Sequence, residues 1–405
     1  MHILIVTHRF LRYSIGGTES LANSVALNLI SKGHYVTWLA VGQQQNPGKT
    51  QIRERDDGLV ELEVPPGLRP SYPVGWREQE RAVSGNINKV LRKLGRPVDV
   101  VHVFHFARLG LDFLSLPHLA GKRLFFTLTD YFPICPSSQL YRHNQEVICN
   151  TGPYGETCRR CCSLQGNAHE IDTWRKRNLS LINKRANGVF TQTPFQFKKL
   201  VAAGLKRNLV RKRTAAYPTP PLPTPVQTLP SAGAFFRFGF LGRLSREKGL
   251  SIVLRGFESL HRSTGCRLYV YGVDDNDSRA LRTEAQKCPG TTLRPPVPFG
   301  QLGAVLQHLD CLIIPSLWWE NHPSILSQSI DHGVPVIMAH HPSLKHLEDL
   351  DGVRFVRPGD TRAWISEMAR AIRDNHRLPK KVSEAEKRFD EFVNLMETQY
   401  RQPIH

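Results

Sequence analysis

Short runs of apolar residues recur along the first half of the chain and predict strands of a parallel sheet. A continuous apolar run, without alternating polar residues, is typical of a strand that is buried on both faces. Stretches with helical periodicity, such as Leu21 to Leu29, separate these runs. Strands that alternate with helices predict a doubly wound α/β domain. The strands predicted in this half are Ile3–Val6, Tyr35–Val41, Asp99–Val103, Arg123–Leu128 and Gly188–Thr191.

A proline-rich segment separates this pattern from a second one. Because proline-rich stretches are stiff and build no core, the six prolines between Pro218 and Pro230 assign residues 215–234 to an interdomain linker. We predict one domain at residues 1–214, a second α/β domain at 235–380, and a C-terminal helix within 381–405. Two such domains that face one another would form a ligand-binding cleft. The strands predicted in the second domain are Arg237–Gly242, Arg267–Gly272, Cys311–Pro315 and Pro335–Met338.

Length and composition agree with two folded domains. The 405 residues exceed the roughly 250–300 at which a single core stops growing. With 40% hydrophobic and 22% charged residues, the composition excludes a largely disordered chain, a collagen-like fibre and a small disulfide scaffold. No apolar run approaches the roughly 20 residues that span a bilayer, and the first residues lack the features of a signal peptide. We therefore expect a cytoplasmic protein.

The charge is strongly positive and unevenly distributed. Subtracting the 35 acidic from the 54 basic residues leaves a net charge of +19, which favours a polyanionic partner such as nucleic acid, an anionic membrane or a phosphorylated substrate. The segment from Arg175 to Arg213 holds twelve lysines and arginines and no carboxylate. A solvated basic face would explain scattered lysines, but a long stretch without acids favours an anion-binding surface.

Two segments of the second domain carry residue types suited to a diphosphate leaving group. Arg243 and Lys248 lie five residues apart in the turn between a predicted strand and a helix, where both can reach one diphosphate. Cationic groups and helix-start N–H groups stabilise the negative charge that develops as such a group departs. Farther along, Glu320 precedes another predicted helix. Alone, the two basic residues could equally belong to a surface loop.

Together these segments resemble glycosyltransferase family 4, nucleotide-sugar-dependent enzymes with the GT-B fold. The resemblance includes Gly16-Gly17-Thr18-Glu19 and the strand at Asp99, and extends over most of the chain. It implies two facing Rossmann-like domains with a cleft between them and a C-terminal helix that crosses back to the first domain. It also implies that Arg243 and Lys248 bind the donor diphosphate, so that catalysis needs no metal ion.

The same resemblance assigns further donor contacts. Glu320 matches the first of two glutamates in the family motif and would position the donor. The second, which usually contacts the ribose, falls at Gln328, and this departure puts nucleotide affinity and base preference in question. An inactive, degenerate member is the alternative. The implied donor-binding residues are Gly16, Gly17, Gly242, Arg243, Lys248, Glu320, Asn321, Pro323, Ser324, Ile325 and Gln328.

Two residues of the first domain complete the implied catalytic set. His105 matches a histidine that lies near the donor sugar in related enzymes, although a lone histidine is often structural. Asp130 stands in Thr129-Asp130-Tyr131, where many relatives have His-Asp-Tyr, and is retained as an acceptor-side group or base. Thr129 cannot act as a histidine would.

Cysteines cluster in the segment 132–168. In a reducing cytosol such clustering favours a metal over disulfides, and four thiolates suit a structural zinc ion or, alternatively, an iron–sulfur cluster. Free thiols without a metal remain open. Some family-4 relatives carry a similar cysteine-rich insert, which suggests a subgroup. The predicted ligands are Cys135, Cys149, Cys158 and Cys161, with Cys162 as an alternative to the last.

The resemblance implies a retaining glycosyltransferase that moves a sugar from a nucleoside-diphosphate-sugar to a glycan hydroxyl. The basic segment favours a lipid-linked acceptor and a peripheral position at the inner face of the cell membrane, in surface polysaccharide synthesis. A non-catalytic nucleotide-sugar-binding subunit of a synthase complex is the first alternative, because of Gln328. A basic nucleic-acid-binding protein is the second, but it leaves Arg243, Lys248 and Glu320 unexplained.

Overall fold

A computed structural model of the chain divides into two α/β units. Unit 1 combines Met1–Gln145, Cys149–Tyr217 and Asp390–His405, and unit 2 combines Glu146–Ile148 and Pro218–Phe389. Both units contain parallel sheets, as predicted. The structure describes residues 1–13, 16–42, 50–65, 76–143, 145–149, 158, 160, 168–212, 219–222, 235–274, 278–375 and 378–402.

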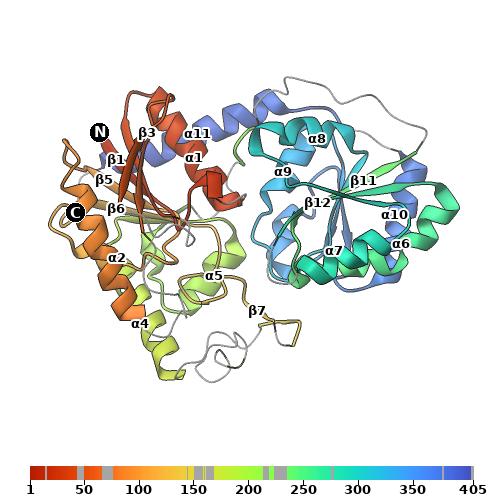
Figure 1. Cartoon of the computed structure of the whole chain (residues 1–405), viewed down its shortest axis with the longest axis horizontal. Helices are drawn as coiled ribbons and strands as arrows, with labels where there is room; N and C mark the ends of the chain where they lie inside the picture. The colour runs from red at the N-terminus through yellow and green to blue at the C-terminus, as the bar shows by residue number, and fades with distance from the viewer. Residues whose placement is uncertain are drawn as a thin grey trace. The chain divides into compact units, whose positions relative to one another are not determined.

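The sheet of unit 1 has the strand order β10-β9-β6-β5-β1-β2-β4-β3 (Figure 1). Its neighbours pair in parallel, except that β3 runs antiparallel to β4. The chain first builds outward from β1 through β2, and later returns to add β5 on the other side of β1. The strand order therefore reverses between β1 and β5, which is where ligands bind in open α/β sheets. The strands are β1 (His2–Val6), β2 (Tyr35–Val41), β3 (Gln51–Glu54), β4 (Val60–Val64), β5 (Val100–Val103), β6 (Arg123–Leu128), β9 (Gly188–Thr191) and β10 (Val210–Lys212).

Helices connect these strands, and a separate two-stranded ribbon pairs β7 (Tyr141–Arg142) with β8 (Val147–Ile148). The helices are α1 (Gly17–Ser31), α2 (Trp76–Leu91), α4 (Ala168–Arg185) and α5 (Pro194–Ala202). Thr193 caps α5, because its side chain accepts a hydrogen bond from the N–H of Gln196, and Pro194 occupies the first helical position.

The C-terminal helix α11 (Val382–Arg401) belongs to unit 2 up to Phe389 and to unit 1 from Asp390 onward. In unit 1 its last turns are held by a buried hydrogen bond between Tyr400 and His102, whose other ring nitrogen lies 2.9 Å from the Thr127 hydroxyl. The ion pair of Lys32 with Asp390 adds a contact at 2.5 Å. The end of the chain is thus an integral part of unit 1.

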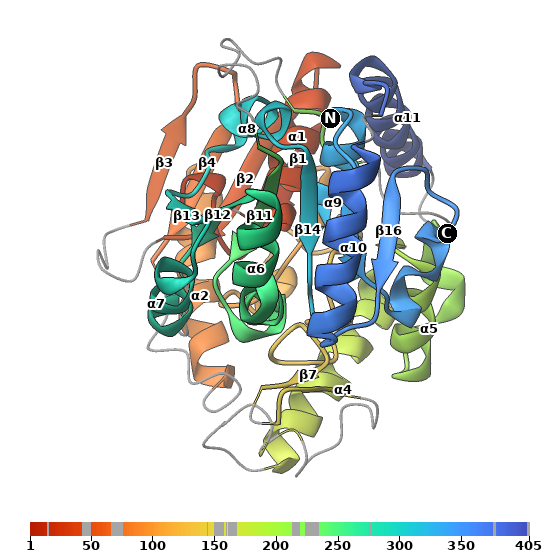
Figure 2. The ribbon, with the colours of Figure 1, turned by 90° about the vertical axis from the view of Figure 1, so that its right-hand side faces the viewer.

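Unit 2 contains a fully parallel sheet of order β13-β12-β11-β14-β15-β16. Its strand order reverses between β11 and β14. Figure 2 shows α6 and α10 over one face of this sheet. The elements are β11 (Arg237–Arg243), α6 (Leu250–Thr264), β12 (Arg267–Val273), α7 (Ser278–Lys287), β13 (Thr291–Arg294), α8 (Leu302–His308), β14 (Cys311–Ile314), α9 (Ser324–Asp331), β15 (Val336–Ala339), β16 (Val353–Val356) and α10 (Thr361–Asp374).

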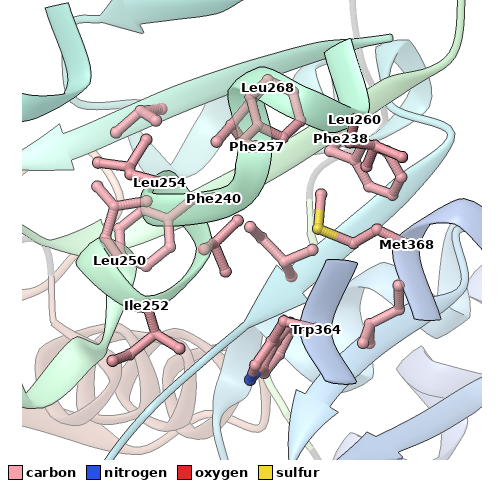
Figure 3. Close-up of a cluster of buried hydrophobic side chains, with 14 of the residues drawn as sticks. Phe238, Phe240, Leu250, Ile252, Leu254, Phe257, Leu260, Leu268, Trp364 and Met368 are labelled. Atoms are coloured by element: carbon pink, nitrogen blue, oxygen red, sulfur yellow. The ribbon is translucent and has the colours of Figure 1, made fainter. Parts of the chain in front are cut away.

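Each face of this second sheet is covered by its own hydrophobic cluster. Phe238 and Phe240 point to one face, where they pack with Phe257 of α6 and Trp364 of α10 (Figure 3). Leu312 and Val336 belong to the opposite cluster, which includes Leu222 from the predicted linker. Strands buried on both faces explain the continuous apolar runs in the sequence.

No helix within the described part of the chain combines the length and apolar character needed to cross a bilayer. The predicted linker 215–234 lies largely outside the described residues, which include only 219–222 of it.

Candidate functional site

The turn after β11 brings the basic motif of unit 2 against the segment after β14. Gly249 adopts a φ of +72°, and a β-carbon there would lie 1.9 Å from the carbonyl oxygen of Pro315. The N–H of Leu317 donates to the carbonyl of Glu247 at 2.7 Å. Only glycine combines this left-handed conformation with so close an approach. The two predicted donor-binding segments therefore meet at the reversal point of the sheet.

Lys248 and Glu320 form the central ion pair of this site. Oε1 of Glu320, a residue only 5% exposed, accepts three hydrogen bonds, which come from Lys248 Nζ at 2.5 Å, Ser316 Oγ at 2.8 Å and Trp318 Nε1 at 2.8 Å. The ammonium also lies 5.1 Å from the centre of the Trp318 ring. These contacts fix the position of the lysine, as preorganised stabilisation of a leaving group requires.

Arg243 is attached to a second buried carboxylate. Its guanidinium donates to Glu247 Oε1 at 3.1 Å, and the hydroxyl of Ser245 donates to the same oxygen at 2.6 Å. Glu247 is buried, whereas the Arg243 side chain is 44% exposed. Arg243 thus combines an anchored guanidinium with substantial access to solvent.

Helix α9 carries the departure from the family motif. The side-chain amide of the buried Gln328 donates to the carbonyl of Pro220 at 3.2 Å. A carboxylate at this position would place an acceptor against an acceptor, so the amide matches its surroundings. Of the other predicted donor residues, Asn321 is buried, and Gly242, Pro323, Ser324 and Ile325 are half-buried.

Unit 1 collects four titratable side chains near the reversal point of its own sheet. His105 follows β5 and Asp130 follows β6, and His105 Nε2 lies 3.0 Å from Asp130 Oδ2. Nδ1 of His105 accepts a hydrogen bond from the N–H of Ala107 at 3.1 Å, so Nε2 carries the proton of the neutral ring. Nε2–H then donates a hydrogen bond to Asp130. His8, which follows β1, stacks on His105 with ring centres 4.3 Å apart. Nδ1 of His8 lies 3.1 Å from Glu19 Oε1.

Burial and neighbouring charges shift the pKa values of these side chains in different directions: the pKa of Glu19 and that of His105 are raised, and that of His8 is lowered. Burial raises the pKa of Glu19 to about 7. Burial, and then the proximity of His105, lower the pKa of His8 well below its ordinary value. Burial alone would lower the pKa of His105, but the Asp130 carboxylate outweighs it and raises that pKa.

The sequence alone did not single out His8 or the role of Glu19. The approach of His8 to His105 depends on the pairing of β1 with β5, and the position of His8 shortly after the first strand was the only available signal. Gly16 is half-buried before α1, Gly17 is exposed at its start, and the Thr18 hydroxyl lies 2.6 Å from that of Thr129.

The predicted metal ligands are only partly described. Cys135, Cys149 and Cys158 are buried, and Cys135 is close enough to Cys158 for its pKa, raised mainly by burial, to respond to it. Cys158 accepts a hydrogen bond from Arg175 at 3.4 Å. Cys161 and Cys162 lie outside the described residues, within which no group of three His, Cys, Asp or Glu side chains could hold a metal ion.

The basic segment 175–213 is divided by the structure. Arg175 is buried and donates to the carbonyl of Ile134, and Arg177 forms ion pairs with Glu80 and Asp112. These two arginines bind the protein itself and do not belong to a free cationic surface. The exposed members that the structure describes are Lys176, Lys184, Lys198, Lys206, Arg207 and Arg211.

Comparison with known proteins agrees with this arrangement. Residues 228–389 match the family Glycosyl transferases group 1, and no curated protein matches the chain. Sucrose-phosphate synthase from Thermosynechococcus elongatus is similar in structure, with a TM-score of 0.68, 14% identity and coverage of 99% of this chain and 98% of that one. Anabaena Alr3699/HepE in complex with UDP and glucose has a TM-score of 0.63 at 12% identity, covering 98% and 97%. The catalytic domain of starch synthase IV from Arabidopsis thaliana, bound to ADP and acarbose, has a TM-score of 0.61 at 13% identity, covering 98% of each chain.

These similarities confirm the predicted fold class, GT-B with two Rossmann-like domains, and the prediction that the chain carries a glycosyltransferase domain. Family 4 and the cysteine-rich subgroup stay predictions.

Proposed function

We propose that this protein is a retaining glycosyltransferase that moves a sugar from a nucleoside-diphosphate-sugar to a hydroxyl of a lipid-linked glycan. The observation that carries the proposal is the ion pair of Lys248 with the buried Glu320, at the reversal point of the sheet in the domain that matches glycosyltransferases. Ligands of open α/β sheets bind at such points. A lysine paired there with a carboxylate that Ser316 and Trp318 hold in place is suited to a diphosphate.

Arg243 and Lys248 would hold the diphosphate while its bond to the sugar breaks. The bond from the anomeric carbon to the diphosphate oxygen breaks as the acceptor hydroxyl attacks from the same face, and the departing diphosphate takes the acceptor's proton. Glu320 would position the donor through the lysine. Fixed donors of this kind typically contribute a factor of about 10² to 10³ in rate.

In unit 1, His105 and Asp130 would form hydrogen bonds with the sugar. The hydrogen bond between them fixes the orientation of the imidazole, and His105 is buried whereas Asp130 is partly exposed. A buried imidazole held by a carboxylate is a well-oriented hydrogen-bonding group. Asp130 would then be the acceptor-side group that remains accessible.

The lipid-linked acceptor is supported by the exposed part of the basic segment. The segment from α5 to β10 has four exposed basic residues, Lys198, Lys206, Arg207 and Arg211. Each basic residue near an anionic membrane contributes about 1 kcal/mol to binding. Sedimentation with phosphatidylserine vesicles at low salt tests this proposal. A chain that stays in the supernatant would refute the membrane association and leave the sugar transfer intact.

A structural metal at the cysteines is the second part of the proposal that needs its own test. Cys135 and Cys158 lie close together, and Cys149 is also buried, which suits thiolate ligands of zinc. Bound zinc would supply ordering energy to the loop, with no part in the transfer. We expect about one zinc per chain by elemental analysis and its loss in Cys135→Ser. Cys266→Ser is the matched control. Iron in place of zinc would favour an iron–sulfur cluster at these cysteines.

Nucleotide release from UDP-, GDP-, dTDP- and ADP-sugars, with thermal shift in parallel, tests the transferase itself. We expect release from one donor and its loss in Lys248→Met, with the exposed Lys345→Met as the control. Binding without release would favour the non-catalytic subunit, which is supported by the attachment of Gln328 to Pro220. A chain that binds no donor would refute both.

A further inference from the structure

His8 and Glu19 form a buried pair to which the proposed transfer assigns no role. Nδ1 of His8 and Oε1 of Glu19 are both buried, and neither forms a hydrogen bond among the described residues. They lie 3.1 Å apart. Buried polar atoms in native proteins are almost always partnered, so a hydrogen bond between these two atoms would satisfy both. Such a bond requires one proton between the ring and the carboxyl group.

The rest of the His8 ring has access to solvent. Its side chain is 24% exposed although Nδ1 is buried, whereas Glu19 behind it is 2% exposed. His8 lies two residues beyond the end of β1, one of the two strands at the reversal point of unit 1, and stacks on His105. When the Glu19 carboxylate accepts a hydrogen bond from Nδ1–H, the lone pair of the neutral ring is on Nε2. The ring then presents a hydrogen-bond acceptor on its accessible side.

We propose that His8 contacts the substrate, with Nε2 accepting a hydrogen bond from a sugar hydroxyl, and that Glu19 is the residue that positions it by holding the Nδ1 proton. This inference rests on the proposed glycosyltransferase function and adds to it a contact outside the nucleotide-binding unit. Either the donor sugar or the acceptor glycan supplies such a hydroxyl.

Proton exchange on Glu19 gives this contact a pH dependence. A protonated Glu19 would donate to Nδ1 and leave Nε2 as a donor, so the acceptor form requires the carboxylate. Because burial raises the pKa of Glu19 to about 7, the acceptor form prevails above neutral pH. His105, Arg9 and Asp130 also act on Glu19, and Arg108 acts on His8, so the variant Glu19→Gln must identify the source of any pH effect.

The tautomer of His8 can be measured without any substrate. Nitrogen-15 NMR of the full chain, labelled at the histidine rings and assigned with His8→Asn, should show the Nδ1-protonated tautomer at about pH 8 in the wild type. Glu19→Leu should lose this preference, and Glu19→Gln, which keeps an acceptor oxygen, should retain it. A wild-type ring protonated on Nε2 at that pH would overturn the proposal.

Activity tests the substrate contact. His8→Asn keeps an N–H that can reach Glu19 but has no atom at Nε2, whereas His8→Gln restores a polar atom there. We expect kcat/KM for nucleotide release from the donor sugar to fall about 10- to 100-fold in His8→Asn and to recover partly in His8→Gln. The affinity for the free nucleoside diphosphate should not change. A loss confined to transfer, with release to water unaffected, assigns the hydroxyl to the acceptor.

Two outcomes would refute this contact. A kcat/KM within twofold of wild type in His8→Asn, for both release and transfer, refutes the contact and leaves the proposed function standing. A wild type that releases nucleotide from no donor refutes the proposed function and the contact together, while the NMR measurement still decides whether the pair exists.

Discussion

Glu19 gives unit 1 a stability that should fall as the pH rises. Burial raises the pKa of this carboxyl from 4.5 to about 7, so the folded state binds the proton more tightly than the unfolded chain does. The stabilisation is therefore fully present below about pH 4.5 and is lost as the pH rises through 7. At 1.36 kcal/mol for each pH unit between the two values, the loss amounts to about 3 kcal/mol. Most of it falls between about pH 5 and pH 8.

The change that tests this reasoning is Glu19→Gln, which keeps the shape of the side chain and removes its charge. Hydrogen exchange of peptides covering β1 and β5, measured during urea unfolding of the full chain, gives the free energy of unfolding of unit 1 separately from that of unit 2. Between pH 5 and pH 8, the free energy of unfolding of unit 1 should fall by about 3 kcal/mol less in the variant than in the wild type. The exposed Glu391→Gln, also in unit 1, should follow the wild type.

Comparison of the two curves removes the contribution of all other titrating groups. If Glu19→Gln and the wild type lose stability equally over this range, the carboxyl is not held in its neutral form by burial. The pH dependence proposed for the His8 contact would then be absent, because the Glu19 carboxylate would stay ionised below neutral pH as well. If the variant loses less stability than the wild type, but the difference between them is far below 3 kcal/mol, water reaches the carboxyl.

Three further substitutions test other contacts. Lys248→Met should lower the rate of nucleotide release about 10²- to 10³-fold, because it removes the ammonium proposed to stabilise the leaving diphosphate. Gln328→Glu, which restores the family residue, should lower the unfolding free energy of unit 2 by about 1–3 kcal/mol in urea, since it sets a carboxylate against the carbonyl of Pro220. Tyr400→Phe should cost unit 1 a similar amount, because it leaves a ring nitrogen of His102 buried without its partner. Unchanged values would contradict each of these interpretations.

The sequence was sufficient for strands that are buried on both faces. Tyr35–Val41 and Arg123–Leu128 were predicted with the bounds that the structure has. The strands β3 and β4 escaped prediction because they are rich in charged residues. Glu61, in the middle of β4, is buried and forms an ion pair with Arg12, a contact that no pattern of apolar residues can indicate.

The candidate site was predictable where its residues are close in sequence. The spacing of Arg243 and Lys248 identified the basic turn, and the resemblance identified Glu320. The contact between Gln328 and Pro220 joins residues 108 positions apart, and it depends on where the linker packs against α9. Such a contact follows from tertiary structure alone, which is why the missing second glutamate looked like a defect in the sequence.

The two units place chemically different groups at corresponding positions of their sheets. Unit 2 has Arg243 at the end of β11 and Glu320 after β14, and its contacts are ion pairs with buried carboxylates. Unit 1 has His8 after β1 and His105 after β5, and its contacts are pairs of imidazole and carboxylate. Among these groups, burial raises the pKa of Glu19 to about 7. A fixed positive charge suits the leaving diphosphate of the proposed transfer, whereas oriented imidazoles suit hydroxyl groups. We therefore expect the pH dependence of catalysis to originate mainly in unit 1.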